Sequence, residues 1–385
     1  MSTYRLKDFV DPIAITVQDP ANSGFERFVG LEHYDSNELV IKRFSGVELL
    51  TTNAKAFQKN DLLIARRNVY LRRAGVVYFD GITSGDSIVL RVKEDCEKQT
   101  GISRELAQRV LPLVLNTDRF WIYANKHADG MNSKRISKDT LLDYEFDLPS
   151  IEEQKVLADK LWAAYKVKES YRQLLFTTDE MLTAKFQEMF GDVDNNKHNF
   201  PVEALGKICE CYAGATPSTE KSEYWNGGTI PWMSSGEVHK KFVTYTDAFI
   251  TTEGYNHSST KMVPIHSIVV ALAGQGKTRG TVAVNEIELC TNQSLCAIVP
   301  SSTINYLYLF HNLNSRYLEI RNMAGDIAGR GGLNLKIINS IKVILPPMEL
   351  QQQFAEIATQ AEATKASLRA SIEAIDRVIR SLINQ

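Results

Sequence analysis

The 385-residue sequence lacks the features that mark several common classes of protein. It has no apolar run near the ~18 residues that a membrane span requires, and its start, MSTYRLKDFVDP, has no apolar segment of a signal peptide. Five cysteines are too few, and odd in number, for a disulfide framework, so we expect reduced thiols. These absences predict a cytoplasmic protein with no membrane partner.

Signatures of metal binding and catalysis are also scarce. Cys209, Cys211, Cys290 and Cys296 could in principle bind zinc, but their C-x-C and C-x5-C spacings are unusual for a zinc site. The histidines show no ligand spacing, and neither a Ser-His-Asp grouping nor a glycine-rich cofactor loop stands out. We therefore predict a non-catalytic protein with no metal and no cofactor of its own.

An excess of positive charge is missing as well. The chain has 44 basic and 46 acidic residues, a net charge of −2, whereas a basic balance is the usual sign of nucleic-acid binding. Any DNA-binding surface would therefore depend on local clusters of basic residues, and a partner could supply part of the positive charge.

The sequence does contain a long duplication. Residues 148–190 begin LPSIEEQKVLADKL and residues 345–385 begin LPPMELQQQFAEIA, and a shift of 197 positions aligns the two. Between positions 151 and 190 there is neither glycine nor proline, while Pro149 precedes this run and Gly191 follows it, as expected at the two ends of a helix. A helix of this length spans roughly 60 Å at ~1.5 Å per residue.

Both predicted helices have an apolar seam with alternating steps of four and three residues, which is typical of a coiled coil. The seams correspond, and each includes a lysine at the same place, Lys168 and Lys365. We predict that the helices pair with each other in an antiparallel coiled coil with pseudo-two-fold symmetry. The seam residues are Leu157, Leu161, Leu175, Leu182, Phe354, Leu368, Ile372, Ile375 and Ile379.

A segment of similar length precedes each predicted helix. Both segments contain short runs of Val, Ile and Leu bounded by Gly, Asp and Asn, which predict strands. The sequence thus predicts an α+β protein with two α/β domains, each followed by a long helix. The expected boundaries are residues 1–147 for the first domain, 148–191 for the first helix, 192–346 for the second domain and 347–385 for the second helix.

Polar, basic loops occur at corresponding places in the two domains. One pair lies between predicted strands, in ARRNVYLRRAG and ALAGQGKTRG, and a second pair lies just before the long helices. Arginine suits contacts to phosphate and to guanine, although each loop could also be a solvated charged hairpin. The candidate DNA-binding residues are Arg66, Arg67, Arg72, Arg73, Lys134, Arg135, Gln275, Lys277, Thr278, Arg279 and Arg330.

Two features allow an alternative interpretation. Residues 271–278, ALAGQGKT, come close to a phosphate-binding loop, but that motif needs glycine where Ala271 stands and must open a helix, whereas the following residues predict a strand. An NTPase is therefore disfavoured. The first long helix also has more apolar residues than one seam needs, so this surface contacts either the domains of the chain or another protein.

The sequence resembles the specificity subunits of type I restriction-modification systems. The resemblance rests on ALGKICECYAGATPS, EYWNGGTIPW, SIVVALAGQGKTRGTVAV and the two helix entries LPSIEEQ and LPPMELQQQ, while the first domain lacks the G-x-TPS and YW-x-GG-x-IPW elements. It implies two target recognition domains that read a bipartite site on double-stranded DNA. It further implies a helical spacer, two adenine methyltransferase subunits that carry S-adenosylmethionine, and a restriction and translocation subunit as an optional partner.

Other interpretations stay open from the sequence. A specificity subunit of another methyltransferase-linked system would have the same two domains. A coiled-coil protein whose domains bind protein in place of DNA would belong to a different class, and its interactions would be insensitive to salt.

Overall fold

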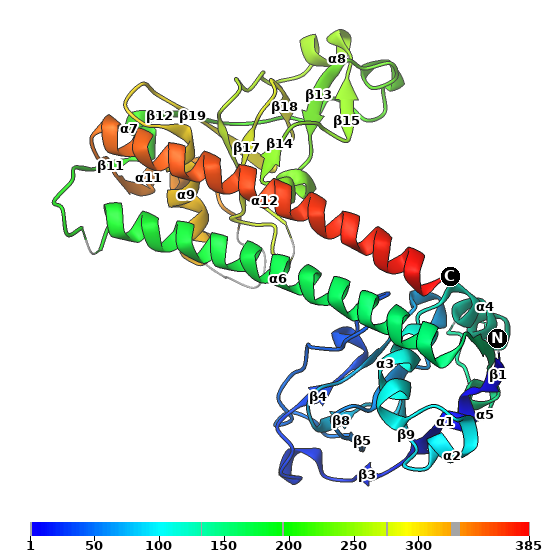
Figure 1. Cartoon of the computed structure of the whole chain (residues 1–385). Coiled ribbons are helices and arrows are strands. Elements are labelled where there is room, and N and C mark those ends of the chain that lie inside the picture. Colours follow the sequence, from blue (N-terminus) through cyan, green and yellow to red (C-terminus); the bar gives the residue numbers. More distant parts are fainter. Residues whose placement is uncertain (1, 132, 195, 275, 325–331, 385) are drawn as a thin grey trace. The chain divides into compact units, whose positions relative to one another are not determined.

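The computed structural model describes residues 2–131, 133–194, 196–274, 276–324 and 332–384 (Figure 1). The chain forms two compact units. Unit 1 contains Met1–Arg172 and Ala370–Gln385, and unit 2 contains Gln173–Arg369. Each unit therefore contains one globular domain and parts of two long helices, α6 (Ile151–Phe190) and α12 (Met348–Ile383). The mixed fold with two long helices confirms the predicted fold class.

The strands of unit 1 form a pair and two four-stranded sheets. In the pair, β1 (Ser2–Arg5) runs antiparallel to β10 (Glu145–Leu148), directly before α6. The first sheet has the order β2 (Val10–Ile13), β9 (Ser87–Val92), β6 (Leu62–Ala65) and β7 (Ala74–Val76). The second sheet has the order β3 (Thr16–Val17), β5 (Ala54–Phe57), β8 (Gly81–Thr83) and β4 (Phe28–Val29).

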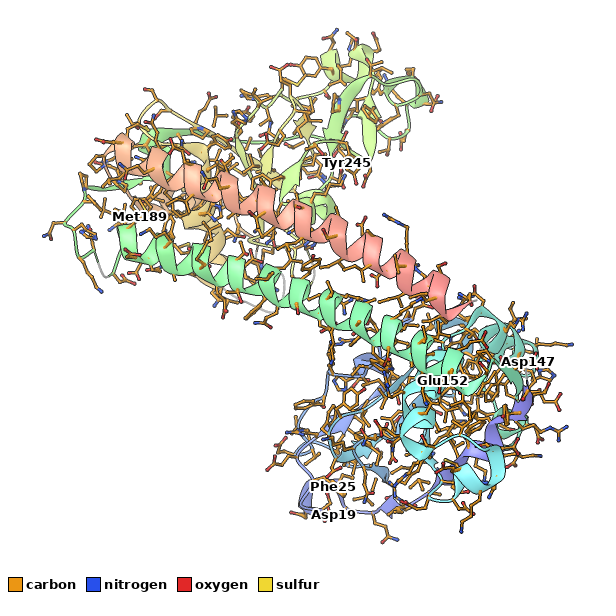
Figure 2. The ribbon with its side chains drawn as sticks, in the orientation of Figure 1. Asp19, Phe25, Asp147, Glu152, Met189 and Tyr245 are labelled. Carbon is orange, nitrogen blue, oxygen red and sulfur yellow. The ribbon has the colours of Figure 1, made fainter. Side chains whose placement is uncertain are left out.

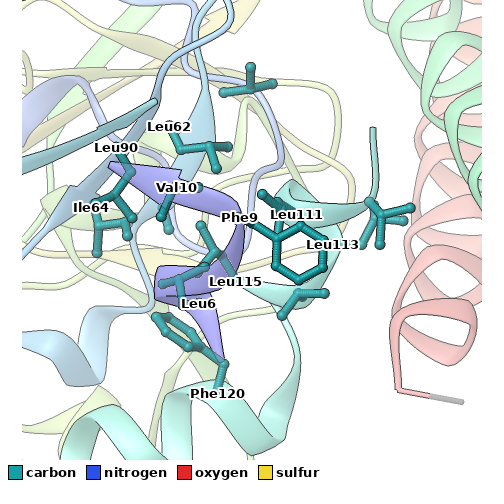
Figure 3. Packing of buried hydrophobic residues seen from close by; sticks show 14 of the residues in the cluster. Leu6, Phe9, Val10, Leu62, Ile64, Leu90, Leu111, Leu113, Leu115 and Phe120 are labelled. Carbon is teal, nitrogen blue, oxygen red and sulfur yellow. The ribbon is translucent and has the colours of Figure 1, made fainter. Parts of the chain in front are cut away.

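Short helices cover the first of these sheets. They are α1 (Leu6–Phe9), α2 (Cys96–Thr100), α3 (Arg104–Val114), α4 (Asp118–Lys126) and α5 (Lys138–Leu142), with 3-10 turns η1 (Pro20–Asn22), η2 (Leu31–His33) and η3 (Val69–Leu71). Figure 3 shows how Leu6 and Phe9 of α1 pack with Leu62 and Leu90 of the sheet and with Leu111 of α3. This apolar cluster is the main core of unit 1.

Unit 2 repeats this layout. Its strand pair is β11 (Val202–Ala204) with β20 (Lys342–Ile344). The larger sheet has the order β12 (Cys209–Ala213), β19 (Leu295–Pro300), β16 (Ile268–Ala271), β17 (Val282–Asn285) and β14 (Phe242–Val243). The smaller sheet has the order β15 (Ala248–Ile250), β13 (Ile230–Met233) and β18 (Cys290–Thr291). The helices are α7 (Leu205–Ile208), α8 (Thr252–Asn256), α9 (Tyr306–Ser315), α10 (Tyr317–Asn322) and α11 (Leu335–Ser340), with 3-10 turns η4 (Ser222–Tyr224) and η5 (Ser235–Lys240).

The duplication is visible in the strand order. The order β2-β9-β6-β7 in unit 1 corresponds to β12-β19-β16-β17 in unit 2. Even a minor parallel contact recurs, because the bridge between Val40 and Val76 has its counterpart in the parallel pairing of β14 with β17. Two copies of one domain topology therefore precede the two long helices.

The two long helices pack against each other within each unit. In unit 1, Leu161 near the start of α6 shares a core cluster with Ile379 near the end of α12. In unit 2, Phe186 near the end of α6 shares a cluster with Phe354 near the start of α12. The start of each helix thus lies with the end of the other, so the helices run antiparallel. The nine predicted seam residues are all buried or partly buried.

The surplus apolar residues of α6 divide into two groups. Trp162 and Tyr165 pack on the core of unit 1, and Phe186, Met189 (Figure 2) and Phe190 pack on the core of unit 2. The second group lies in solvent: Val156, Val167, Leu174, Phe176 and Met181 are each 43–57% exposed. Contact with the chain's own domains therefore accounts for only part of this surface.

A partly buried histidine in α9, His311, is expected to make the stability of unit 2 depend on pH. The ring of His311 lies 5.3 Å from that of Phe354, and its Nε2 is buried without a hydrogen-bond partner among the described residues. Burial and, to a smaller extent, the charge of Lys365 lower its pKa from 6.5 to about 4. As the pH falls through this interval, the unfolded chain binds a proton that the folded chain does not, so folding stability is lost.

We therefore expect unit 2 to lose about 2 kcal/mol of stability as the pH falls from 6.5 to 4. Hydrogen exchange of the α9 amides at several pH values measures this loss. His311→Gln should flatten the dependence, whereas the same substitution at the exposed His127 of unit 1 should leave it unchanged. An equally steep loss in His311→Gln would show that another group is responsible.

Candidate nucleic-acid interface

In unit 1, the two candidate loops lie side by side at the end of β6. We call residues 66–73 the hairpin loop and residues 127–137 the pre-helix loop of this unit. The backbone N–H of Ile136 donates to the carbonyl of Arg66 (3.0 Å), and the N–H of Asn68 donates to the carbonyl of Lys134 (2.7 Å). The sequence placed these loops about 60 residues apart, and the fold makes them one surface.

Basic side chains from both loops gather around one carboxylate. The guanidinium nitrogens of Arg67 and Arg135 lie 3.9 and 3.3 Å from the Asp86 carboxylate, and Arg67 Nε donates to Ser133 Oγ (2.7 Å). Lys134 is exposed and has no side-chain partner in the described part of the chain. One carboxylate among several basic groups leaves this surface with a positive balance.

Lys55 and Asp86 also belong to this surface, although no motif in the sequence singles them out. Lys55 Nζ donates to the carbonyl of Ser87 (2.8 Å). Burial lowers the pKa of Lys55, and the nearby charge of Arg66 lowers it further. Lys55 lies on a separate strand, so no local pattern linked it to the arginines of the hairpin loop.

Arg72 and Arg73 have different surroundings from Arg66 and Arg67. Arg72 Nη1 lies 2.5 Å from the Asp118 carboxylate, at the start of α4. The Arg73 guanidinium donates to the carbonyls of Leu31 (3.0 Å) and Arg67 (3.1 Å), and burial lowers its pKa. Both side chains therefore support the shape of the loop, and their contacts leave fewer donors for a ligand.

Unit 2 has the same junction between its hairpin loop, residues 272–280, and the residues before α12. The N–H of Leu333 donates to the carbonyl of Leu272 (2.9 Å), and the N–H of Leu272 donates to the carbonyl of Ser294 (2.8 Å). In unit 1 the N–H of Arg66 likewise donates to the carbonyl of Asp86 (2.9 Å). The duplicated fold thus reproduces the loop junction together with two of its hydrogen bonds.

The candidate residues of unit 2 differ in their contacts. Lys277 is exposed, and its ammonium has no partner among the described residues. Thr278 Oγ1 lies 3.3 Å from His239 Nε2, and the carbonyl of Arg279 accepts from Arg321 Nη1 (3.3 Å). Two further candidates, Gln275 and Arg330, lie outside the described residues.

Glycine is required where the hairpin loop of unit 2 returns to β17. Gly280 has φ +84°, and a Cβ there would lie 3.2 Å from the Cα of Arg321. A side chain at this position would therefore strain the backbone and press on α10. This close approach holds the neighbouring Arg279 beside α10.

The ATPS and YW motifs of unit 2 hold a third loop at the same end of the sheet. The indole N–H of Trp232 donates to the carbonyl of Ala215 (3.1 Å), and that of Trp225 donates to the carbonyl of Ser218 (3.1 Å). Thr216 Oγ1 bonds the side chain of Gln293, in the turn after β18. Sequence reasoning missed Thr216 and Gln293, although the ATPS and YW motifs pointed to their loop.

The hairpin loop of unit 2 does not have the surroundings of a phosphate-binding loop. It joins β16 to β17, which pair antiparallel, so a strand and not a helix follows Thr278. Backbone N–H groups at a helix start, which hold phosphate in such loops, are thus missing from this described part of the chain. This geometry gives the NTPase alternative no support.

Neither a metal centre nor a membrane span occurs in the ranges that the structure describes. No group of three or more His, Cys, Asp or Glu side chains there could hold a metal ion. Cys209 is buried, and burial raises the pKa of its thiol to about 12. No described helix is long and apolar enough to cross a membrane.

Comparison with known proteins agrees with this architecture of two duplicated domains and two long helices. Residues 198–377 match the family described as the type I restriction modification DNA specificity domain. The specificity subunit of the type I restriction enzyme EcoR124I/EcoR124II of Escherichia coli is 30% identical over 169 residues, covering 43% of this chain and 42% of that protein. That of HindI of Haemophilus influenzae is 26% identical over 152 residues, covering 39% and 32%. In these matches the chain spans less than half the length of either relative.

Two solved structures share the fold over nearly the whole chain. The type I restriction-modification S subunit from M. genitalium matches with a TM-score of 0.58 and 13% identity, covering 99% of this chain and 94% of that one. A chain from a study of complex assembly and conformational transition of the type I R-M system gives 0.57 and 16%, covering 99% and 96%. The resemblance found in the sequence is confirmed: residues 198–377 match the type I DNA specificity domain, and the chain has the fold of the solved S subunits.

Proposed function

We propose that this chain is the non-catalytic DNA-recognition subunit of a type I restriction-modification complex. Each domain, residues 1–147 and 192–346, would read one half of a bipartite site on double-stranded DNA. The helical segments, residues 148–191 and 347–385, would separate the two half-sites. The observation that carries this proposal is the same polar, basic loop junction at the same sheet end in both units.

The chemistry of the two junctions suits DNA. Exposed Arg67, Lys134 and Arg135 in unit 1 and Lys277 in unit 2 present donors that phosphate oxygens and guanine accept. Neutralising each phosphate releases counterions, so binding should weaken as salt rises. The near-neutral net charge of the chain then suggests that partner subunits contribute part of the DNA-binding surface.

The exposed apolar residues of α6 support docking of partner proteins. Val156 and Val167 in unit 1 and Leu174, Phe176 and Met181 in unit 2 are each about half-exposed, so each unit offers apolar side chains for contact with a partner. We propose two DNA adenine methyltransferase subunits as partners, with a restriction and translocation subunit able to join them. The assembly would work in the cytoplasm, and S-adenosylmethionine would belong to the methyltransferase.

Co-expression with a type I adenine methyltransferase, followed by genome-wide mapping of methyladenine, tests the proposal. We expect a new methylated motif made of two short half-sites with a spacer of fixed length. The assigned role would be contradicted if no new methylation appeared, or if the methyltransferase produced the same methylation without this chain.

Single substitutions in the two loop junctions should affect different half-sites. We expect Arg67→Ala to weaken recognition of one half-site and Lys277→Ala that of the other, each in duplex binding by the complex. Loss of a base contact should cost ~1–3 kcal/mol and relax specificity, whereas loss of a phosphate contact should reduce the salt slope by ~1.

The exposed Lys207, which forms an ion pair with Glu203 outside the junction, provides a matched control. Lys207→Ala should leave both half-sites unaffected. Unchanged binding by the two loop variants would show that the recognition surface lies elsewhere on the domains.

A further inference from the structure

Two lysines occupy corresponding seam positions and are almost completely buried. Lys168 and Lys365 are each only 3% exposed. Lysine is rarely this buried unless a carboxylate pairs with it. In unit 1, Lys168 Nζ lies 2.6 Å from Oδ1 of Asp376, and in unit 2, Lys365 Nζ lies 2.6 Å from Oδ1 of Asp179. Each buried ammonium is therefore paired with an aspartate of the other long helix.

The two ion pairs are copies of each other under the duplication. Lys365 follows Lys168 by 197 positions, and Asp376 follows Asp179 by the same number. Asp179 is 11 residues after Lys168 along α6, and Lys365 is 11 residues before Asp376 along α12. In antiparallel helices a step forward on one matches a step back on the other. The two pairs, one in each unit, therefore record one and the same helix register.

The apolar seam alone does not specify this register. Its positions repeat every seven residues and are mostly Leu, Ile and Ala, so a slip of one heptad again places apolar residues against apolar residues. A slip would, however, replace Asp376 beside Lys168 with either Arg369 or Ile383. In one direction the other helix brings a like charge to the buried ammonium, and in the other it brings an apolar side chain.

The same slips have the same effect in unit 2. There, Asp179 beside Lys365 would be replaced with Arg172 or Phe186. A buried charge that loses its partner is strongly destabilising, whereas the intact pair adds little compared with well-packed apolar residues. The pairs are thus poor devices for stability and effective devices for selecting one register.

Each lysine also has a second carboxylate that does not depend on the register. Glu362 precedes Lys365 by one turn of the same helix and pairs with it. Glu38, in the first domain, lies 2.7 Å from Lys168 Nζ and also accepts from Arg172 (2.6 Å). Burial acts to raise the pKa of Glu38, but the hydrogen bonds from Arg172 and Lys168 outweigh it and the pKa is lowered. The aspartates are therefore the partners that distinguish one register from another.

We infer that the ion pairs Lys168–Asp376 and Lys365–Asp179 set the register of α6 against α12, and thereby restrict the half-site spacing that the protein accepts. The four side chains are positioning residues that touch no DNA. The first part of the inference stands on the helix contacts alone, and the second part rests on the proposed function.

The register can be measured on the chain without DNA by disulfide trapping. Val167 and Val378 of unit 1 are both half-exposed, and each stands one residue before a seam position. In a Cys211→Ser background, Val167→Cys with Val378→Cys reports the native register. Val167→Cys with Ser371→Cys reports a slip of one heptad, about 10 Å along the helix. Oxidation with a copper–phenanthroline reagent then traps whichever pair is close.

The decisive variant replaces both ion pairs with apolar residues: Lys168→Met, Asp376→Leu, Lys365→Met and Asp179→Leu. We expect the thermal midpoint to stay within a few degrees of the wild type, because apolar replacement of a buried pair is close to neutral. The yield of the native disulfide should fall at least about two-fold and the slipped disulfide should appear. Lys168→Arg with Lys365→Arg should retain the native disulfide alone, because both positive charges remain.

If the fourfold variant fails to fold, the two substitutions of one unit are tested alone, either Lys168→Met with Asp376→Leu or Lys365→Met with Asp179→Leu.

The exposed pair Glu152 and Lys155 at the start of α6 is the matched control. Glu152→Leu with Lys155→Met should change neither disulfide. The inference is overturned if the fourfold variant forms the native disulfide alone. This holds even if its thermal midpoint falls, because a loss of stability without a change of register would show that the ion pairs have only a structural role.

Duplex binding by the complex with the methyltransferase tests the second part. The wild type should bind duplexes with one spacer length most tightly. In the fourfold variant, the ratio of its affinity for that spacer to its affinity for other spacers should fall at least about ten-fold. If the slipped disulfide appears but the spacer preference is unchanged, the link between register and spacing is overturned. If the slipped disulfide appears but even the wild type shows no specific duplex binding, the role of the ion pairs in the register stands and the proposed function is contradicted.

Discussion

Phe354→Ala is expected to destabilise unit 2 by about 3–5 kcal/mol, as do other truncations of fully buried aromatic residues. The ring of Phe354 is completely buried, and its centroid lies 5.1 Å from Phe186, 5.7 Å from Phe190 and 5.3 Å from His311. It thus joins α12 to both α6 and α9. Truncation would leave a cavity at the point where the helix pair is attached to the second domain.

Denaturant unfolding together with hydrogen exchange of α9 and the first turns of α12 measures this effect. Phe249→Ala is the matched control, because Phe249 belongs to the same unit but is 43% exposed. Its cost should stay within about 0.5 kcal/mol. If the two variants lost similar stability, the aromatic cluster would not be the anchor of the helices in unit 2.

A matched insertion of seven residues into both long helices is expected to lengthen the preferred spacer without changing the half-sites. The natural places are after Arg172 in α6 and after Arg369 in α12. These are the boundaries between the two units, and they are 197 positions apart. One heptad preserves the seam and adds about 10 Å of helix, or up to about three base pairs at ~3.4 Å each.

Methyladenine mapping and duplex binding with a series of spacers measure the outcome. An insertion in α6 alone is the informative control, because it shifts the seam residues of one helix against those of the other and should reduce specific binding at every spacer length. An unchanged spacer preference after the matched insertion would contradict the role of the helices as a spacing element.

The boundaries of the long helices were predictable because their signals are local. The run without glycine or proline predicted a helix over 151–190, and α6 spans Ile151–Phe190. Gly191, which follows it, has φ +68°, a left-handed conformation that favours glycine and ends a helix. The antiparallel sense could not be derived from the seam pattern, since it depends on contacts such as that of Leu161 with Ile379.

The candidate site was predictable only in part. The sequence showed that the hairpin loops hold corresponding places in the two halves, because strand patterns on either side align. It could not separate Arg67, beside the pre-helix loop, from Arg72, paired with Asp118, because the difference depends on which distant carboxylate lies nearby. Lys55 was invisible to local reasoning for the same reason.

The sequence by itself therefore determined the duplication, the two long helices with their seam, and the resemblance to type I specificity subunits. Each of these depends on residues close together in the chain or on periodic repetition. Only the tertiary structure decided which loops share a surface and which acid neutralises each buried lysine. Lys168 and Asp376 are more than 200 residues apart, yet the desolvated ammonium requires that carboxylate at 2.6 Å. Pairing at such a separation follows from how the helices pack, which no local pattern records.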